Sequence, residues 1–229
     1  MQVSTYLKDT YRDQADTQVI AVGSREGAPW VAVADCLFHP QGGGQPADRG
    51  WLDGSEVVPV RDHESGLIVA RAPEGAGLPV FTEGQPVKAR IDLETRKTHA
   101  ALHTAGHLIE AAGRAQGWTC AGNIHFPGQA RIEFTADRPD ARLADPQGRE
   151  ELTAALRETV AAAIAEDLPV TADHGEQGQR IVRLGTLHAA PCGGTHVRSL
   201  ADLAEVALPT LKVKKGRIRV SYTAAHRPR

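Results

Sequence analysis

Two pairs of residues in this sequence have the side chains and the spacing of a metal site. His103 and His107 lie four residues apart, and Cys192 and His196 repeat that spacing much later in the chain. Imidazole and thiolate groups are the usual ligands of Zn²⁺, and their mixture suits zinc better than it suits harder cations. Because the two pairs are remote in sequence, the pattern predicts a single zinc site that the fold brings together.

The neighbours of these pairs restrict the chemistry of such a site. In a metalloprotease helix, a Glu directly after the first His acts as general base, but Thr104 occupies that position here. Gly193 and Gly194 separate the second pair, and glycines allow a tight turn with unusual dihedrals that a substrate can approach closely. By helical phase, His99 and Glu110 are candidates for outer contacts to the site, although a surface ion pair is the favoured role for Glu110.

The number of candidate ligands leaves the role of the metal open. Four protein ligands are typical of a closed, structural zinc, whereas a catalytic zinc keeps one position for water or substrate. Three alternatives follow: one of the four residues is a loose ligand, the ion expands its shell, or the ion positions a substrate without activating water.

A glycine-rich segment runs from Phe38 to Gly50 and contains three consecutive glycines, Gly42 to Gly44. It follows a strand-like run but does not open a helix, so neither the P-loop nor the dinucleotide-binding fingerprint fits. Taken alone, the segment is best interpreted as a hairpin or a β-bulge.

The first 92 residues contain short apolar runs separated by Gly and Pro. Regular short strands with this punctuation are typical of a small barrel or sandwich. The predicted strands are Val19–Val22, Trp30–Asp35, Val57–Arg61, Leu67–Arg71 and Val87–Ile91.

The pattern changes to helical spacing at Asp92, a plausible N-cap for a helix that reaches about Gly117 and carries both His103 and His107. A second helix is predicted from Pro146 to about Asp167. Helices mixed with non-alternating strands indicate an α+β layer, so we expect two domains, 1–92 and 93–229. The predicted strands of the second domain are Arg131–Thr135, Arg180–Leu184, Ala204–Ala207 and Gly216–Tyr222.

Charge is unevenly distributed along the 229 residues. The whole chain has a formal net charge of -2 and is 41% hydrophobic and 24% charged, as in an ordinary globular protein. Residues 1–92 have a net charge of -5 and residues 93–229 a net charge of +3. The last 18 residues could contact phosphates or form a solvated strand with a frayed tail. They contain no acidic residue and seven basic ones: Lys212, Lys214, Lys215, Arg217, Arg219, Arg227 and Arg229.

Cysteine usage and hydropathy indicate the cellular setting. Cys36, Cys120 and Cys192 are too few for a disulfide framework, and the N-terminus lacks the apolar core of a signal peptide. No apolar run approaches membrane-spanning length. We therefore expect a reduced, cytoplasmic protein without a membrane partner, whose thiolates are available to a metal.

Together these segments resemble the alanyl-tRNA editing family, which comprises the editing domain of alanyl-tRNA synthetase and its free-standing AlaX-type relatives. Residues 102–108 are similar to the first metal motif of the family and residues 192–197 to the second. Residues 38–50 resemble the glycine-rich motif of its preceding β-barrel. Asn123 and residues 131–134 resemble the segment between the metal motifs, and the basic strand ending near Tyr222 also matches.

The resemblance implies a fold, a reaction and a set of site residues. The implied fold is α+β, with a small N-terminal β-barrel and a two-layer editing domain shared with threonyl-tRNA synthetase. The implied activity is trans-editing: zinc-containing hydrolysis of the ester in Ser- or Gly-tRNA(Ala), with contacts to the tRNA acceptor end. His103, His107, Cys192 and His196 would hold Zn²⁺ and carry catalysis. The substrate-binding residues implied are Cys36, Gly44, Gln45, Asn123, Gly193, Gly194 and Thr195.

The chain departs from the family pattern at three positions. Cys36 stands where the family commonly has a Thr implicated in recognising the serine hydroxyl, and a thiol is a weaker hydrogen-bonding group. His39 replaces a Tyr, and Glu133 replaces a more usual Asp. The preferred amino acid is therefore open.

Two alternatives remain at the level of sequence. One is editing of Ser-tRNA(Thr) by a related zinc domain, although the glycine-rich motif favours the alanine branch. The other is a non-catalytic RNA-binding module, in which zinc is structural and the basic tail binds phosphate.

Overall fold

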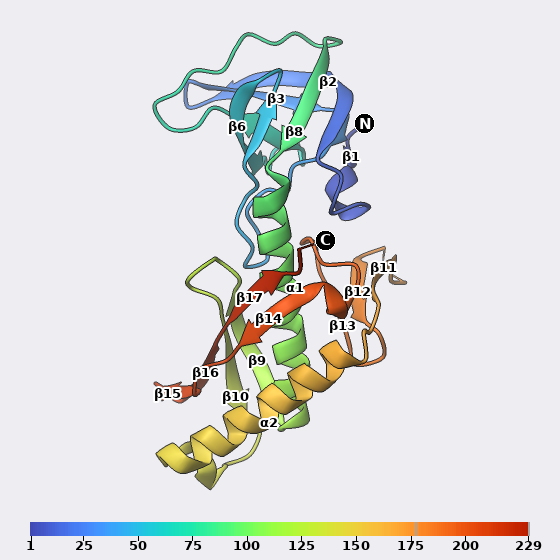
Figure 1. The fold of residues 1–229 in the computed structure, drawn as a ribbon. Helices are drawn as coiled ribbons and strands as arrows, with labels where there is room; N and C mark the ends of the chain where they lie inside the picture. The colour runs from blue at the N-terminus through green and yellow to red at the C-terminus, as the bar shows by residue number, and fades with distance from the viewer. Residues whose placement is uncertain (177, 229) are drawn as a thin grey trace. The chain divides into compact units, whose positions relative to one another are not determined.

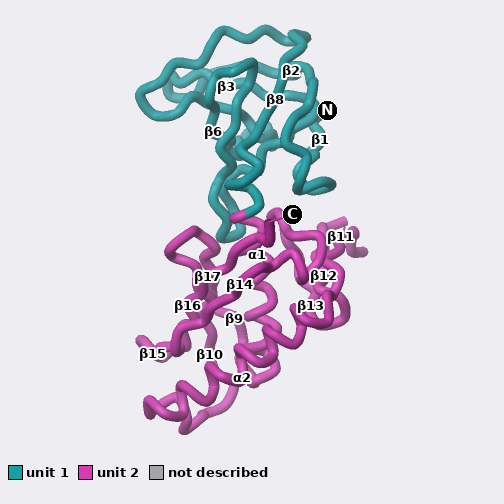
Figure 2. Tube along the Cα trace, in the orientation of Figure 1, with its two compact units in different colours: residues 1–97 teal, residues 98–229 magenta. Residues whose placement is uncertain are grey.

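The computed structural model describes residues 1–176 and 178–228, and these form two compact units. Unit 1 comprises Met1–Lys97 and unit 2 comprises Thr98–Arg229, coloured separately in Figure 2. The fold class is mixed α+β with a closed six-stranded β-barrel, so the predicted class is confirmed. The boundary that we predicted at residues 92 and 93 stays a prediction.

Unit 1 is built around the barrel, in which every neighbouring pair of strands is antiparallel. Four predicted strands match within a few residues, whereas the run at Val19–Val22 belongs to a much longer strand. In order around the barrel, the strands are β2 (Gln14–Arg25), β3 (Ala28–Val33), β7 (Ile68–Arg71), β6 (Ser55–Arg61), β5 (Gly50–Leu52) and β8 (Pro86–Ile91). Outside it, β1 (Val3–Ser4) pairs with β4 (Asp35–Cys36), and a short 3-10 helix covers Thr5–Leu7.

A buried ion pair in unit 1 holds the glycine-rich segment. The guanidinium of Arg96 is fully buried and pairs with the Asp48 carboxylate, while also donating to the Leu37 carbonyl oxygen at 2.7 Å. Asp48 accepts a further hydrogen bond from the backbone N–H of His39 at 2.5 Å. A buried charge is tolerated only when it is paired and hydrogen-bonded. Arg96 meets this condition through Asp48 of the glycine-rich segment and through contacts outside it, including the Thr10 carbonyl oxygen at 3.2 Å.

The glycine-rich segment was predicted to form a hairpin or a bulge, and the structure shows a hairpin turn at residues 42–45. Gly42 and Gln45 exchange backbone hydrogen bonds of 3.1 and 2.9 Å. Gly43 and Gly44 between them have φ of +56° and +78°, the conformation that a two-residue hairpin turn requires at both positions.

Unit 2 contains most of helix α1 (Leu93–Ala115) and all of α2 (Pro146–Ala165). Figure 1 shows β14 and β17 passing in front of α1, with α2 below them. A four-stranded sheet has the order β15 (Lys212–Lys214), β16 (Arg217–Ser221), β10 (Arg131–Ala136), β9 (Trp118–Ile124). A three-stranded sheet has the order β11 (Val170–His174), β12 (Arg180–Leu184), β13 (His188–Pro191). In a separate two-stranded sheet, β14 (Leu203–Ala207) pairs with β17 (Thr223–His226). Short 3-10 helices cover Ala141–Leu143 and Leu200–Asp202.

Both helices begin where their sequence signals predict. The Asp92 carboxylate accepts from the Thr95 N–H at 3.1 Å, and the Asp145 carboxylate accepts from the N–H groups of Gln147 and Gly148 at 2.8 and 3.1 Å. Such caps satisfy N–H groups that the first helical turn leaves unpaired. The apolar stripe of α1 lies in the core of unit 2: Ala101, Leu102, Ala105, Leu108, Ile109 and Ala112.

Candidate metal centre

The four predicted metal ligands come together in unit 2. His103 and His107 lie on successive turns of α1, and Cys192 and His196 follow the end of β13. One ligating atom from each of the four residues lies within 4.8 Å of those of the other three. The Cys192 Sγ is 3.4 Å from the His103 Nε2 and 3.3 Å from the His196 Nε2.

These distances fit a zinc ion. With zinc–sulfur and zinc–nitrogen bonds of about 2.3 and 2.0 Å, two tetrahedral ligands lie about 3.5 Å apart. The third imidazole provides an independent indication, because the His107 Nε2 is buried and has no hydrogen-bond partner. Buried polar atoms are almost always satisfied, and a cation would satisfy this lone pair.

Burial favours the uncharged imidazole that a metal requires. Desolvation, followed by the neighbouring His188 and His125, lowers the pKa of His107 to about 3. Burial also raises the pKa of the Cys192 thiol, although the N–H of Gly194, 3.4 Å from its sulfur, acts in the opposite direction. Binding a cation would favour loss of the thiol proton.

Thr104, at the position of the metalloprotease base, has a different contact. Its buried Oγ1 lies 3.2 Å from the His196 Nδ1 and 3.2 Å from the backbone N–H of Val197. If His196 bound a metal through Nε2, its Nδ1 would carry the hydrogen and donate it to Thr104. Partners of this kind fix the orientation of a metal-bound imidazole.

Two further histidines surround the ligands and were not singled out from the sequence. The ring of His125 stacks on that of His103 with centroids 4.4 Å apart, and its Nδ1 lies 2.6 Å from the Tyr222 hydroxyl. Tyr222 donates to the Leu102 carbonyl oxygen at 3.0 Å. His188 contacts His107, with 3.1 Å between the His188 Nε2 and the His107 Nδ1. Neither histidine belongs to the two pairs that predict the metal site, and only the fold shows that they lie near the metal ligands.

Of the two candidates for outer contacts, Glu110 lies near a metal ligand and also forms an ion pair, whereas the role of His99 stays a prediction. The Glu110 carboxylate lies 3.8 Å from the His107 Nδ1 and accepts from Arg114 at 3.0 Å. His99 is buried on the same helix. Glu133, which stands where the family pattern usually has Asp, lies on β10 and forms ion pairs with Arg219 at 2.8 Å and Arg131 at 3.3 Å.

The segment between Cys192 and His196 differs from the prediction in one respect. Among the described glycines with positive φ, neither Gly193 nor Gly194 appears, so the turn needs no unusual dihedral. A Cβ at Gly193 would meet nothing within 4 Å, whereas Thr195 is fully buried. The backbone beside Cys192 is therefore open at Gly193.

The remaining predicted substrate residues are distributed over both units. Asn123 lies exposed on β9, opposite Ile132 of β10. In unit 1, Cys36 is buried, its sulfur lies 3.7 Å from the Phe38 carbonyl oxygen, and burial raises the pKa of its thiol to about 12. Gly44 and Gln45 form the hairpin described above. The approach of these unit 1 residues to the metal ligands stays a prediction.

Two basic surfaces are candidates for contacts with phosphate. In unit 2, Lys214, Lys215, Arg217 and Arg219 line a pocket of about 320 Å³ with Glu133 as its one acidic residue. Part of this charge is neutralised, because the two arginines contact Glu133 at 3.8 and 2.8 Å. Arg229 of the predicted basic tail lies outside the described residues.

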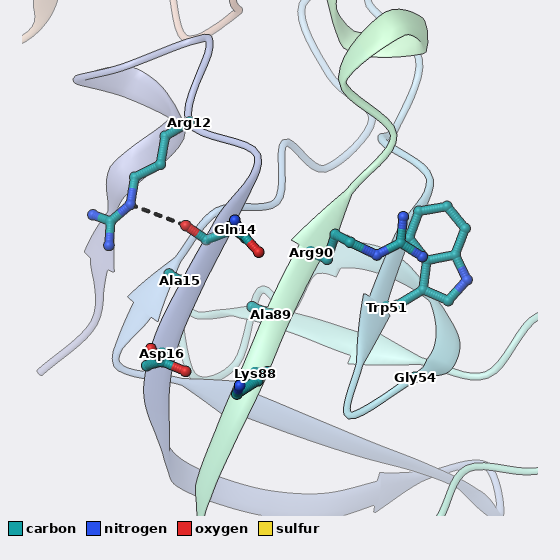
Figure 3. A pocket seen from close by; sticks show the side chains of 9 residues that line it. All are labelled: Arg12, Gln14, Ala15, Asp16, Trp51, Gly54, Lys88, Ala89 and Arg90. Atoms are coloured by element: carbon teal, nitrogen blue, oxygen red, sulfur yellow. Dashed lines mark hydrogen bonds between the residues drawn. The ribbon is translucent and has the colours of Figure 1, made fainter.

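The second basic surface lies on the outside of the barrel (Figure 3). Its pocket has a volume of about 480 Å³ and includes Arg12, Lys88 and Arg90 with Asp16. The Arg90 guanidinium lies over the Trp51 ring, 3.9 Å from its centroid. Trp51 is half-buried, and cations beside an aromatic ring are a common combination in surfaces that bind single-stranded nucleic acid.

Comparison with known proteins confirms the predicted resemblance. Over 97% of its length the chain is 27% identical to "Alanyl-tRNA editing protein AlaX-L" of Pyrococcus horikoshii, of which it covers 58%. It is 25% identical over 88% of its length to AlaX-M of the same organism, covering 87% of that protein. It is also 33% identical over 86% of its length to the alanine–tRNA ligase of Frankia alni, covering 24%.

The chain thus spans little more than half the length of AlaX-L and about a quarter of the ligases. No known protein-family profile matches it. Among the described residues, no helix has the length and hydropathy needed to cross a membrane.

Proposed function

Since the chain is an AlaX-type relative of the alanyl-tRNA editing proteins, we propose that it is an aminoacyl-tRNA deacylase that hydrolyses Ser- or Gly-tRNA(Ala). The observation that carries this proposal is the meeting of His103, His107, Cys192 and His196 around one point. Two remote segments, which resemble the metal motifs of that family, supply a set of donors that suits Zn²⁺.

A need for such a reaction follows from the limits of amino-acid selection. A pocket that accepts alanine cannot strongly reject glycine, which is smaller, or serine, which adds only a hydroxyl. A second site that hydrolyses the wrong ester therefore increases fidelity. The ester is already activated, so the site need only position and polarise it.

The chain's own residues would divide this work. A bound zinc would supply Lewis-acid polarisation of the ester and a lower pKa for nearby water. Cys192 is the least buried of the four ligands and adjoins the open backbone at Gly193, so the acylated ribose would approach from this side. Asn123 and Thr195 of unit 2 would contact the substrate, and a role of Gly44 and Gln45 in substrate binding stays a prediction.

The barrel residue Cys36 bears on which amino acid is removed. Its thiol is neutral, buried and directed to the Phe38 carbonyl oxygen, and it is a weaker hydrogen-bonding group than the threonine of the family pattern. Seryl and glycyl esters would then be distinguished mainly by size. The basic surfaces on the two units would bind the phosphates of the tRNA acceptor end.

The experiment is a deacylation time course with the zinc-loaded full chain on Ser-, Gly- and Ala-tRNA(Ala) and on Ser-tRNA(Thr). We expect release of serine and glycine from tRNA(Ala) and little release of alanine. Cys192→Ala should lose both zinc and activity, whereas the control Cys120→Ala, at a half-buried thiol on β9, should keep both.

Three outcomes would contradict the proposal. Full activity of Cys192→Ala would remove the metal from the reaction, and preferential release from Ser-tRNA(Thr) would favour the threonine branch. Binding of tRNA without release of any amino acid would favour a non-catalytic module, an alternative that the four protein ligands support.

A further inference from the structure

The contact between His107 and His188 determines which nitrogen of His107 can bind a metal. The His107 Nδ1 lies 3.1 Å from the His188 Nε2, and both side chains are buried, at 7% and 3% exposure. His188 is the first residue of β13, four positions before Cys192. The strand that leads to the thiol ligand therefore also supports an imidazole ligand of α1.

Only one of the two facing nitrogens can carry the hydrogen of this bond. If His188 donated it, a neutral His107 would carry its own hydrogen on Nε2 and could not offer that atom to a metal. If His107 donates from Nδ1, its Nε2 keeps a free lone pair. The His107 Nε2 is the buried atom without a partner, so only the second arrangement allows a cation to satisfy it.

We propose that His188 is a positioning residue, which accepts the Nδ1 hydrogen of His107 and so reserves the His107 Nε2 for the metal. The inference rests on the zinc site of the proposed function. It assigns to His107 the kind of support that Thr104 gives to His196.

A second cation is the competing interpretation of the same residues. Ligating atoms of His107, Glu110 and His188 also lie within 4.8 Å of one another. However, Glu110 is paired with Arg114 at 3.0 Å, and this guanidinium would repel a second cation. The neighbouring charges therefore favour a hydrogen-bonded partner over a second metal site.

The test measures zinc affinity of the full chain by competition with a chelator. His188→Ala should lower the affinity roughly 10- to 100-fold, as loss of such an outer partner typically does. His188→Gln, whose amide oxygen can take the place of the Nε2 acceptor, should recover most of the loss. The control His174→Ala removes an exposed histidine from β11 of the same sheet and should change nothing.

A spectroscopic measurement identifies which nitrogen of His107 binds the metal. Nitrogen-15 NMR of the zinc-loaded wild-type chain should place the His107 hydrogen on Nδ1. A hydrogen on Nε2, or an unchanged affinity in His188→Ala when the wild type binds zinc and deacylates, would overturn the inference and leave the proposed function standing. Two zinc ions per wild-type chain, one of them lost in His188→Ala, would assign the second cation site instead. A wild-type chain that binds no zinc would overturn both proposals.

Discussion

At the scale of single residues, Thr104 connects the helix ligands to the loop ligands. Its Oγ1 lies 3.2 Å from the His196 Nδ1 and equally far from the Val197 N–H. The side chain is fully buried, so water cannot replace either contact. One hydroxyl on α1 thus fixes both the ring and the backbone of the segment that carries His196.

Thr104→Val tests this role, because valine keeps the shape and removes the oxygen. We expect zinc affinity to fall by about tenfold or more, since such partners orient the ligand that they contact. Chelator competition measures the change. Thr135→Val, at an exposed position of β10, is the matched control, and equal affinity in the two variants would show that Thr104 does not orient His196.

The sequence identifies ligands better than it identifies their supports. His103, His107, Cys192 and His196 could be predicted because their types and spacing are restricted by the geometry of zinc. Thr104 appeared only as a missing base, and His125 and His188 had no signal. Their roles depend on the pairing of strands and on helix packing, which local spacing does not encode.

At the scale of elements, helix α1 contains a glycine that its packing requires. Glycine in a helix interior is destabilising by about 1 kcal/mol relative to alanine. At Gly106, however, an added Cβ would lie 2.6 Å from the His125 Nδ1 and 2.8 Å from the Tyr222 hydroxyl oxygen. The missing side chain is what lets His125 stack on His103.

Gly106→Ala should therefore destabilise the protein despite the better helix propensity of alanine. Overpacking of this kind typically costs about 1–3 kcal/mol, and the His125 ring should be displaced. Urea unfolding measures the change in free energy. Gly122→Ala is the control, because a Cβ at that position of β9 would meet nothing within 4 Å, and a Gly106→Ala variant more stable than wild type would contradict the argument.

The limits of the two helices could be predicted to within about two residues. Their N-terminal caps, Asp92 and Asp145, are residue types that favour this position and can be recognised in the sequence. Several strands were missed. β5 has only 3 residues and no room for a periodic pattern, and β9 mixes small and polar residues. Such strands are specified by their partners across the sheet, since strand propensity depends strongly on context.

At the scale of the whole molecule, unit 2 buries a group of uncharged histidines. Burial lowers the pKa of His125 to about 4 and that of His188 to about 4, from an ordinary value of 6.5. In the unfolded chain these imidazoles would bind protons near the ordinary value. Acid therefore favours the unfolded chain.

The metal-free protein should lose stability as the pH falls from 6.5 to about 4. Above 6.5 the imidazoles are neutral in both states, and their contribution is complete. Within the window the unfolded chain binds more protons, so stability falls by roughly 1.4 kcal/mol per pH unit for each such group. Urea midpoints across this range measure it. His125→Gln should flatten the slope, and an unchanged slope would show that His125 is accessible to protons in the folded protein.

The fold class could be predicted because two sequence patterns correspond to the observed elements. Glycine and proline separate the short strands of the barrel, and apolar residues at helical spacing mark the two helices. The predicted division of the chain at residues 92 and 93 rests on a change of local pattern. The composition changes at Asp92, where α1 is capped, whereas the compact units divide between Lys97 and Thr98. A change of local pattern marks where an element starts, and the limits of a unit are set by contacts that form only in three dimensions.

One continuous helix therefore serves both units, since its first turn is counted with the barrel and the rest with the zinc ligands. A protein trimmed to begin at Thr98 would lose the Asp92 carboxylate and start with a turn of unpaired N–H groups. Unwinding would begin at this cut end, one turn before His103. The ligand-bearing unit cannot be excised cleanly at its own border, and any minimal version of it must retain a piece of its neighbour.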